Sequence, residues 1–193
     1  MSYATSLQTA VPVRLSRFVD AFSTLLDGGA GEARIVDEGG ALLRELVAHD
    51  DWLAHAVASP DPQFYRQYLL YCDPAARFSV VSFVWGPGQR TPIHNHTVWG
   101  LIGLLRGAEI TQDYRAGADG ALGAAAAPQR LEAGSVAAVS PTLGDIHQVF
   151  NAYADQVSIG IHVYGADIGA VDRSTFTLDG ATQAFRSGYA NAA

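Results

Sequence analysis

Residues 86–100 read GPGQRTPIHNHTVWG, and within this stretch a single asparagine separates His94 from His96. Side chains two positions apart point to the same face of a β-strand, so both imidazole rings are expected on one face. Neutral imidazole is a common metal ligand, and two rings on one face provide half of a metal site. The stretch therefore predicts a strand that carries part of a metal centre.

Short runs rich in β-branched and aromatic residues lie on both sides of the histidine pair. These runs are residues 78–85, 100–110, 135–139 and 157–164, and glycine and proline separate them. The pattern is typical of the strands of a β-sandwich or barrel. Residues 116–128, rich in alanine and glycine, are expected to form an exposed loop between strands, although their alanines also allow a short helix.

The first third of the chain has a different periodicity. From residue 11 to about residue 71 apolar side chains recur every three or four positions, which is the period of an α-helix. Breaks at residues 28–31 (GGAG) and 59–62 (SPDP) divide this region into about three helices. The expected fold is mainly β with N-terminal helices. It forms one domain over residues 1–193, with a helical part at 1–75 and a barrel and C-terminal extension at 76–193.

Two blocks of the strand-rich part resemble the two motifs of the cupin superfamily, over roughly residues 78–165. The matching residues are Gly88, His94, His96 and Gly107, then Gly134, Pro141, Gly144, His147 and Asn151. The resemblance implies a cupin barrel, jelly-roll-like, in which His94, His96 and His147 bind a metal ion. The glutamate that usually follows the paired histidines is missing, because residues 97–101 read TVWGL.

The missing carboxylate has a chemical consequence. A divalent ion held by three neutral imidazoles keeps its full charge and favours an anionic ligand such as a thiolate. Open coordination positions of this kind are typical of non-haem iron(II) oxygenases. Zinc with three histidines and a water is the competing interpretation, and the number of ligands cannot decide between the two metals.

Further residues resemble the thiol dioxygenases, the cupin branch that contains cysteine dioxygenase and 3-mercaptopropionate dioxygenase. Phe78 and the Trp85-Gly86 pair resemble the first barrel strand of that family, and residues 160–164 (GIHVY) resemble its Ser-x-His-x-Tyr element. The resemblance implies that Tyr164 points its phenol toward the metal and that His162 forms a hydrogen bond behind it. Gly160 replaces the family serine, so either Ser158 reaches His162 through a bulge or that outer hydrogen bond is absent. An ordinary strand with a buried histidine and tyrosine is the alternative.

A carboxylate-bearing thiol needs a fixed cation, and arginine can bind both carboxylate oxygens. By resemblance to the mercaptopropionate type, Arg173 is the expected anchor and Gln67 a neutral neighbour. Arg66, next to Gln67, would instead form a cysteine-type site. Arg173 could also be a surface partner of Asp172 or Asp167.

The resemblance implies an iron(II)-dependent thiol dioxygenase that converts a small carboxylate-bearing thiol and dioxygen to the sulfinate. 3-Mercaptopropionate is favoured, with cysteine and mercaptosuccinate as alternatives. Two other functions stay open because fold does not fix function: a zinc, nickel or manganese cupin acting as an isomerase or hydrolase, and a non-catalytic cupin that binds a small ligand.

Composition limits the partners. The formal net charge is −7, and only 16% of the residues are charged, so we expect neither nucleic acid nor an anionic membrane as a partner. The single cysteine, Cys72, excludes an intramolecular disulfide and fits a reducing compartment. No leader or long apolar run is evident, so we expect a cytoplasmic protein, as a monomer or small homo-oligomer.

Overall fold

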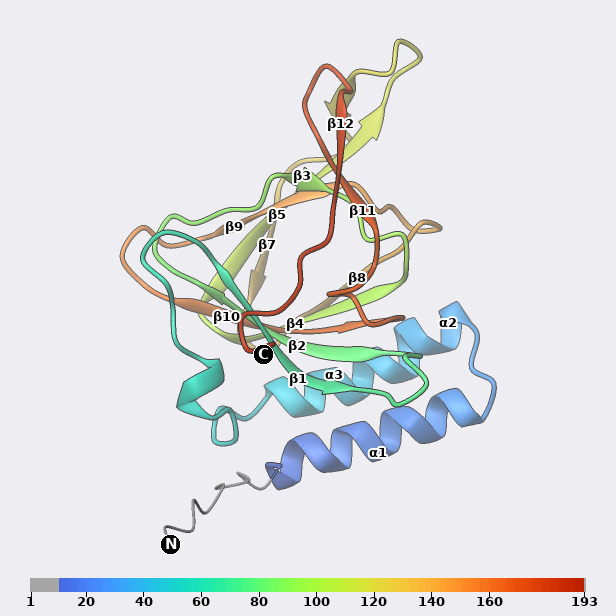
Figure 1. The fold of residues 1–193 in the computed structure, drawn as a ribbon, viewed down its shortest axis with the longest axis vertical. Coiled ribbons are helices and arrows are strands. Elements are labelled where there is room, and N and C mark those ends of the chain that lie inside the picture. The colour runs from blue at the N-terminus through green and yellow to red at the C-terminus, as the bar shows by residue number, and fades with distance from the viewer. Residues whose placement is uncertain (1–10, 193) are drawn as a thin grey trace, which may run out of the picture.

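In the computed structural model, which describes residues 11–192, two β-sheets face each other and helices cover the outside of one of them (Figure 1). The first sheet has the order β1-β2-β10-β4-β8, formed by Arg66–Cys72, Ser79–Trp85, Ser158–Tyr164, Gly100–Arg106 and Val136–Val139. The second sheet has the order β12-β11-β3-β9-β5-β6, with β7 also paired to β5. Its strands are Thr182–Phe185, Arg173–Phe176, Ile93–His94, His147–Asn151, Ala108–Ala116, Leu122–Ala124 and, for β7, Gln129–Glu132.

The strand order is that of a jelly roll. The run β2-β10-β4-β8 faces the run β3-β9-β5-β7. Apart from β5, β6 and β7, which share one sheet, consecutive strands of the barrel cross between the sheets, and its first and last strands, β2 and β10, lie side by side. This arrangement is the double-sheet form of antiparallel barrel in which two Greek keys interlock. Strand β1 extends the first sheet, and strands β11 and β12 extend the second. The expected fold class, a mainly β jelly-roll-like barrel preceded by helices, is confirmed.

The central strands of the first sheet are apolar because both of their faces are covered. Strands β2 and β10 are buried along their whole length. One face, with Val80, Ile161 and Val163, belongs to the same core as the helices. The other face, with Val81 and Phe83, belongs to a second core inside the barrel. Two-sided burial explains why these strands appear in the sequence as continuous apolar runs rather than as alternating patterns.

Helix α1 (Val13–Asp27) ends where residues 28–31 predict a break. The second helical segment is continuous and consists of α2 (Glu32–Arg34), the π-helical η1 (Ile35–Gly39) and α3 (Gly40–Val47), followed by a short 3₁₀ turn, η2 (His55–Val57). Both long helical segments lie on the same side of the barrel in Figure 1. Within residues 11–192, no helix is long and apolar enough to span a membrane.

The third predicted helix is wrong. Residues 66–72 form β1, which pairs antiparallel with β2 from Arg66 opposite Val84 to Cys72 opposite Ser79. A register shift near Leu69 interrupts the alternation of inward and outward side chains, so the run YLLY at residues 68–71 has no clear strand period. The barrel sheet therefore begins within the part of the chain that the periodicity assigned to helices.

Two strand predictions also differ from the structure in detail. The run at residues 100–110 is split by Gly107, whose φ of +69° turns the chain between β4 and β5. The expected loop at residues 116–128 contains β6, in which Leu122 pairs with Ala116. Isolated strands of two to four residues carry too few side chains for a recognisable period.

The C-terminal segment returns across the molecule to lie against β1. The backbone N–H of Ala190 donates to the carbonyl of Gln67 at 2.7 Å. The side-chain amide of Asn191 donates to the carbonyl of Leu69 at 3.0 Å and accepts from its N–H at 2.9 Å. This segment therefore satisfies backbone groups of β1 on the side away from β2.

A glycine on β4 allows α3 to approach the barrel closely. A Cβ atom at Gly103 would lie 2.9 Å from Cγ of Leu43 and 3.0 Å from Cγ1 of Val47, which are helix side chains. We expect Gly103→Val to lower the free energy of unfolding by about 1–3 kcal/mol, because overpacking forces the helix away from the sheet. Chemical denaturation measures this change.

Gly123 on β6 provides the matched control, because a Cβ atom there meets nothing within 4 Å. Gly123→Val is expected to leave the free energy of unfolding nearly unchanged. If both variants lowered the free energy of unfolding equally, the close approach of α3 to β4 at Gly103 would not be the cause of the loss.

Candidate metal centre

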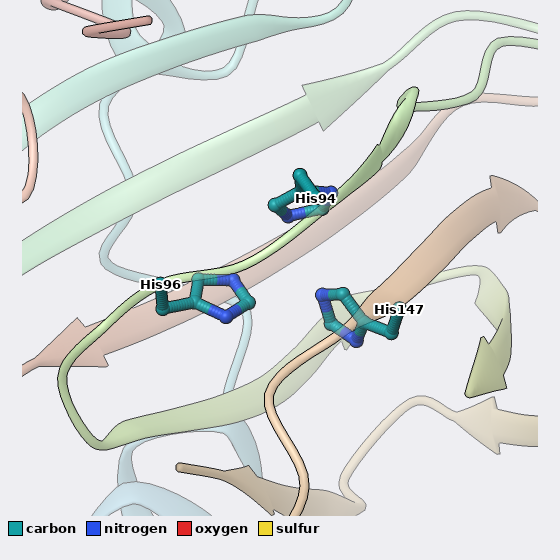
Figure 2. A group of neighbouring side chains, drawn as sticks. All are labelled: His94, His96 and His147. Atoms are coloured by element: carbon teal, nitrogen blue, oxygen red, sulfur yellow. The ribbon is translucent and has the colours of Figure 1, made fainter. Parts of the chain in front are cut away.

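Three buried histidines converge inside the barrel (Figure 2). His94 ends β3, His96 follows two residues later, and His147 begins β9 directly opposite His94 in the antiparallel pair. The ring centroids are 4.8 to 4.9 Å apart in all three pairs. One potential ligand atom from each residue lies within 4.8 Å of the other two. The strand pairing thus places the side chains as a tripod.

Hydrogen bonds orient two of the three rings. Nδ1 of His94 lies 3.1 Å from the carbonyl of Pro92, and Nδ1 of His96 lies 3.0 Å from a carboxylate oxygen of Asp145. Both acceptors require a proton on Nδ1, which leaves Nε2 with a free lone pair for a metal. Asp145 also accepts the backbone N–H groups of His96 and Thr97, at 2.9 and 2.8 Å.

Burial keeps the three imidazoles neutral. Desolvation lowers the pKa of His94 to about 4 and lowers the pKa of His96 and of His147 well below the usual value. The nearby Arg173 guanidinium lowers the pKa of His94 and His96 further. His96 and Asp145 therefore form a hydrogen bond between a neutral ring and a carboxylate rather than an ion pair. Neutral imidazole is the form that binds metal ions.

Tyr164 lies beside this centre with His162 behind it. The Tyr164 ring stacks on His96 with centroids 5.3 Å apart, and its hydroxyl lies 2.9 Å from Nδ1 of His162. His162 in turn stacks on Phe83 at 4.2 Å. Burial raises the pKa of Tyr164, so the phenol keeps its proton. The chemical roles of both residues stay a prediction.

Gly100 makes room for the tyrosine ring. It lies opposite Tyr164 in the pairing of β4 with β10, and a Cβ atom there would lie 2.8 Å from Cε1 of the ring.

Ser158 does not reach His162. Its hydroxyl lies 2.9 Å from Oδ1 of Asn151 and 2.9 Å from the carbonyl of Ala108, and it accepts the Ala108 N–H at 3.1 Å. The register of β10 with β4 does shift between Ile159 and Gly160, but it does not bring Ser158 to His162, and the serine instead joins β10 to β5. Nε2 of His162 has no hydrogen-bond partner.

Arg173 is buried next to the histidines. It begins β11, which pairs with β3 so that Thr175 lies opposite His94; continued by two residues, this register brings Arg173 opposite His96. Its guanidinium donates to Ser187 at 2.6 Å and lies 4.7 Å above the ring of Phe185. Its Nε atom has no partner.

The acidic residues considered as partners of Arg173 are engaged elsewhere. Asp172 binds Arg186, and Asp167 accepts the hydroxyl of Tyr189 at 2.5 Å. Among the described residues, no carboxylate forms a salt bridge with Arg173. The cation therefore lacks a protein counter-ion.

Arg66 and Gln67 are adjacent on β1, and their side chains point to opposite faces of the strand. Arg66 forms an ion pair with Asp61, and its side chain is 42% exposed, whereas Arg173 is only 5% exposed. Gln67 lies opposite the inward-facing Phe83, and its side-chain oxygen is buried without a partner. The structure thus brings Gln67 to the interior and leaves Arg66 at the surface.

Sequence reasoning missed Asp145. An acidic residue two positions before a predicted histidine ligand is a signal that could have indicated Asp145, because ligating histidines commonly donate to carboxylates.

No protein-family model matches the chain. Solved structures that resemble it include an uncharacterised conserved protein with a double-stranded β-helix domain from Klebsiella pneumoniae, at 16% identity, with a TM-score of 0.46 over 61% of this chain and 91% of that one. A cupin superfamily protein from Desulfitobacterium hafniense is 12% identical, with a TM-score of 0.46 over 62% and 94% of the two chains. Cupins are double-sheet jelly rolls, and the strand order described above is of that kind. The strand order is thus the double-sheet jelly roll that the sequence led us to expect.

Cupin barrels differ widely in chemistry. A DMSP lyase from Ruegeria pomeroyi also resembles this chain, at 15% identity and a TM-score of 0.43, over 62% of this chain and 57% of that one. Likeness at this level concerns the fold alone, so function has to be argued from the residues of the site.

A substitution of Asp145 tests its role in the metal centre. We expect Asp145→Ala to weaken binding of zinc or iron(II) by about 10- to 100-fold, because His96 loses the acceptor that fixes its tautomer. Competition titration with a chelator measures the affinity.

Asp51→Ala is the matched control, because it removes an exposed carboxylate paired with Arg14. Its metal affinity should equal that of the unchanged protein. Equal affinities for Asp145→Ala and Asp51→Ala would contradict the assigned role of Asp145.

Proposed function

We propose that this cupin is an iron(II)-dependent thiol dioxygenase that oxidises a small carboxylate-bearing thiol to its sulfinate. The observation that carries the proposal is the pairing of two features within one buried space. Three neutral histidines converge there without a carboxylate ligand, and Arg173 lies beside them without a protein counter-ion. A substrate with one anionic group for each feature matches this arrangement.

The residues present fit the proposed metal. His94, His96 and His147 would hold it through neutral nitrogen atoms, and the second-sphere acceptors Pro92 and Asp145 already orient two of the rings. When bound, iron(II) would supply the redox chemistry by which both atoms of dioxygen are transferred to the thiol sulfur. The balanced reaction adds one dioxygen to one thiol, so no external reductant is required.

Arg173 would bind the substrate carboxylate. Its Nε atom is buried and free, and a planar guanidinium can donate two parallel hydrogen bonds to one carboxylate. Contact with Ser187 and Phe185 restricts its rotation, so the carboxylate is held in one orientation. Fixing the substrate in this way brings the thiol to the histidines, which is a positioning effect.

The other side chains would control protons and water. Tyr164 keeps its phenolic proton and can donate a hydrogen bond toward the space beside His96. Val149 and Ile168 are buried in the same core as Trp85 and exclude water from it. Gln67 offers a neutral polar group on the inner face of β1. Because Gln67 carries no negative charge, it forms no ion pair with an α-amino group, which cysteine has and 3-mercaptopropionate lacks.

The exposed position of Arg66 favours 3-mercaptopropionate over cysteine. In a cysteine-type site, an arginine before the first barrel strand would point inward, but the pair of Arg66 with Asp61 holds it at the surface. Mercaptosuccinate carries a second carboxylate, for which the described interior offers no second unpaired cation.

Oxygen uptake by the iron(II)-loaded protein tests the proposal. We expect consumption with 3-mercaptopropionate that exceeds consumption with cysteine, mercaptosuccinate or cysteamine, together with one equivalent of sulfinate per dioxygen. Zinc-loaded protein is the control and should consume none. Absence of uptake with every thiol would reject the dioxygenase and favour a cupin metalloenzyme of another class or a small-ligand-binding cupin.

A pair of arginine variants tests the carboxylate anchor. Arg173→Ala should raise KM for 3-mercaptopropionate by about 10- to 100-fold, because hydrogen bonds to charged groups contribute roughly 1.5–3 kcal/mol. It should leave the already low turnover of cysteamine, which has no carboxylate, unaffected.

Arg66→Ala is the matched control, since it removes an arginine that is paired at the surface. Its KM should match that of the unchanged protein. A larger effect of Arg66→Ala than of Arg173→Ala would reverse the assignment and restore the cysteine-type site.

A further inference from the structure

Two buried polar atoms beside Gly160 have no close hydrogen-bond partner. They are Oε1 of Glu109 and Nε2 of His162. Buried polar side-chain atoms are normally paired, so two of them in one place indicate a polar arrangement beyond the ordinary core. Glu109 is the more unusual of the two, because its side chain is buried and the structure gives it no ion pair.

The missing side chain of Gly160 brings Glu109 and His162 together. A Cβ atom at Gly160 would lie 2.6 Å from Nε2 of His162 and 2.9 Å from Oε1 of Glu109, so both atoms border the same small space. Gly160 and His162 are two positions apart on β10 and face the barrel interior, and Glu109 reaches this space from β5. Any larger residue at position 160 would overlap with both groups.

We propose that the Glu109 carboxyl is the outer hydrogen-bond partner of His162, directly or through one water, and thereby sets the direction of the hydrogen bond between His162 and Tyr164. Glu109 is thus a positioning residue: it acts on the site through His162. Its carboxyl group would provide the hydrogen bond to Nε2 of His162 that Ser158 does not reach and that Gly160, having no side chain, cannot form.

The protonation states give the hydrogen bonds a direction. Burial raises the pKa of Glu109 to about 8, against the opposing effect of the Trp85 indole N–H. At neutral pH the group is therefore mainly a carboxylic acid, whose O–H can donate to Nε2 of His162. Burial lowers the pKa of His162 to about 3, so its ring carries a single proton.

With Nε2 as an acceptor, the single proton of His162 must lie on Nδ1. Nδ1 then donates to the Tyr164 oxygen 2.9 Å away. The phenolic hydrogen of Tyr164 is consequently free to point toward His96 and the substrate space. If Nε2 carried the proton instead, Tyr164 would have to donate to His162 and could only accept on the substrate side.

Nitrogen NMR of the full-length, zinc-loaded protein tests this direction without depending on any reaction. The ¹⁵N shifts of His162 should show a proton on Nδ1 in the unchanged protein. Glu109→Gln should keep this tautomer, because its amide N–H can also donate to Nε2. Glu109→Leu should shift the population toward the Nε2–H tautomer. A proton on Nε2 in the unchanged protein, or an unchanged tautomer in Glu109→Leu, would overturn the proposal.

Kinetics connect the inference to the proposed dioxygenase, on which this second test rests. Glu109→Leu should lower kcat for the thiol by about 10- to 100-fold with little change in KM, whereas Glu109→Gln should restore most of it. Glu132→Leu, at an exposed position on β7, is the control. Metal content and melting temperature are measured for each variant, and equal kcat for Glu109→Leu and the unchanged protein would reject the role of Glu109.

The two tests separate the two ideas. If no thiol is oxidised by the unchanged protein but the tautomer changes in Glu109→Leu, the dioxygenase fails and the role of Glu109 stands. If thiol oxidation occurs and neither the tautomer nor kcat responds to Glu109→Leu, the dioxygenase stands and the role of Glu109 fails.

Discussion

The antiparallel pairing of β3 with β9 is the constraint on which the metal centre depends. It sets His94 directly across from His147, and β11 pairs with the other side of β3. A slip of one residue in either pairing would turn the affected side chain to the opposite face of the sheet. Two short ladders therefore define the positions of the histidines and of Arg173 at once. Asp145, just before β9, adds the bond that orients His96.

Burial gives the interior of the barrel an unusual electrostatic character. The same desolvation lowers the pKa of the histidines and raises the pKa of Glu109 and Tyr164, so each of these groups is driven to its uncharged form. Arg173 is the exception, because even a lowered guanidinium pKa leaves it protonated. A fixed cation among buried groups that are mostly uncharged attracts an anion strongly, since the Asp145 carboxylate that acts on it is already engaged by His96 and Thr97. The negative net charge of the whole chain does not oppose this local preference at short range.

Sequence reasoning succeeded where side chains have a local signature. The apolar runs of β2 and β10 and the glycine break after α1 each record a local conformation, and the strands and the turn lie where these patterns predict. The His94-Asn95-His96 spacing correctly predicts that the two rings converge, although β3 ends at His94 and His96 lies just beyond the strand. It failed where tertiary pairing overrides the local pattern, as in β1. There, spacing compatible with a helix is drawn into the sheet by pairing with β2.

The proposed role of Glu109 could not be predicted from the sequence, and the sequence indicates Asp145 only through its position two residues before His147. Each depends on a partner far along the chain: Asp145 on His96 and Glu109 on the space beside Gly160. An isolated acidic residue in a sequence is more often a solvated surface group than a buried one, so Glu109 does not stand out. The replacement of serine by Gly160 was visible, but only the fold shows which side chain faces the resulting space.

The C-terminal segment that lies along β1 also covers part of the outer edge of the first sheet. An outer strand with unpaired N–H and carbonyl groups is a template for sheet growth between molecules. The side-chain amide of Asn191 forms hydrogen bonds with the backbone N–H and carbonyl of Leu69. Another strand therefore cannot pair with these two groups, and the amide itself offers no new strand edge. Ser187, a few residues earlier, holds Arg173. The cover on this sheet edge and the orientation of the Arg173 guanidinium therefore depend on one short peptide, residues 187–191, so the chain end and the barrel interior are mechanically linked.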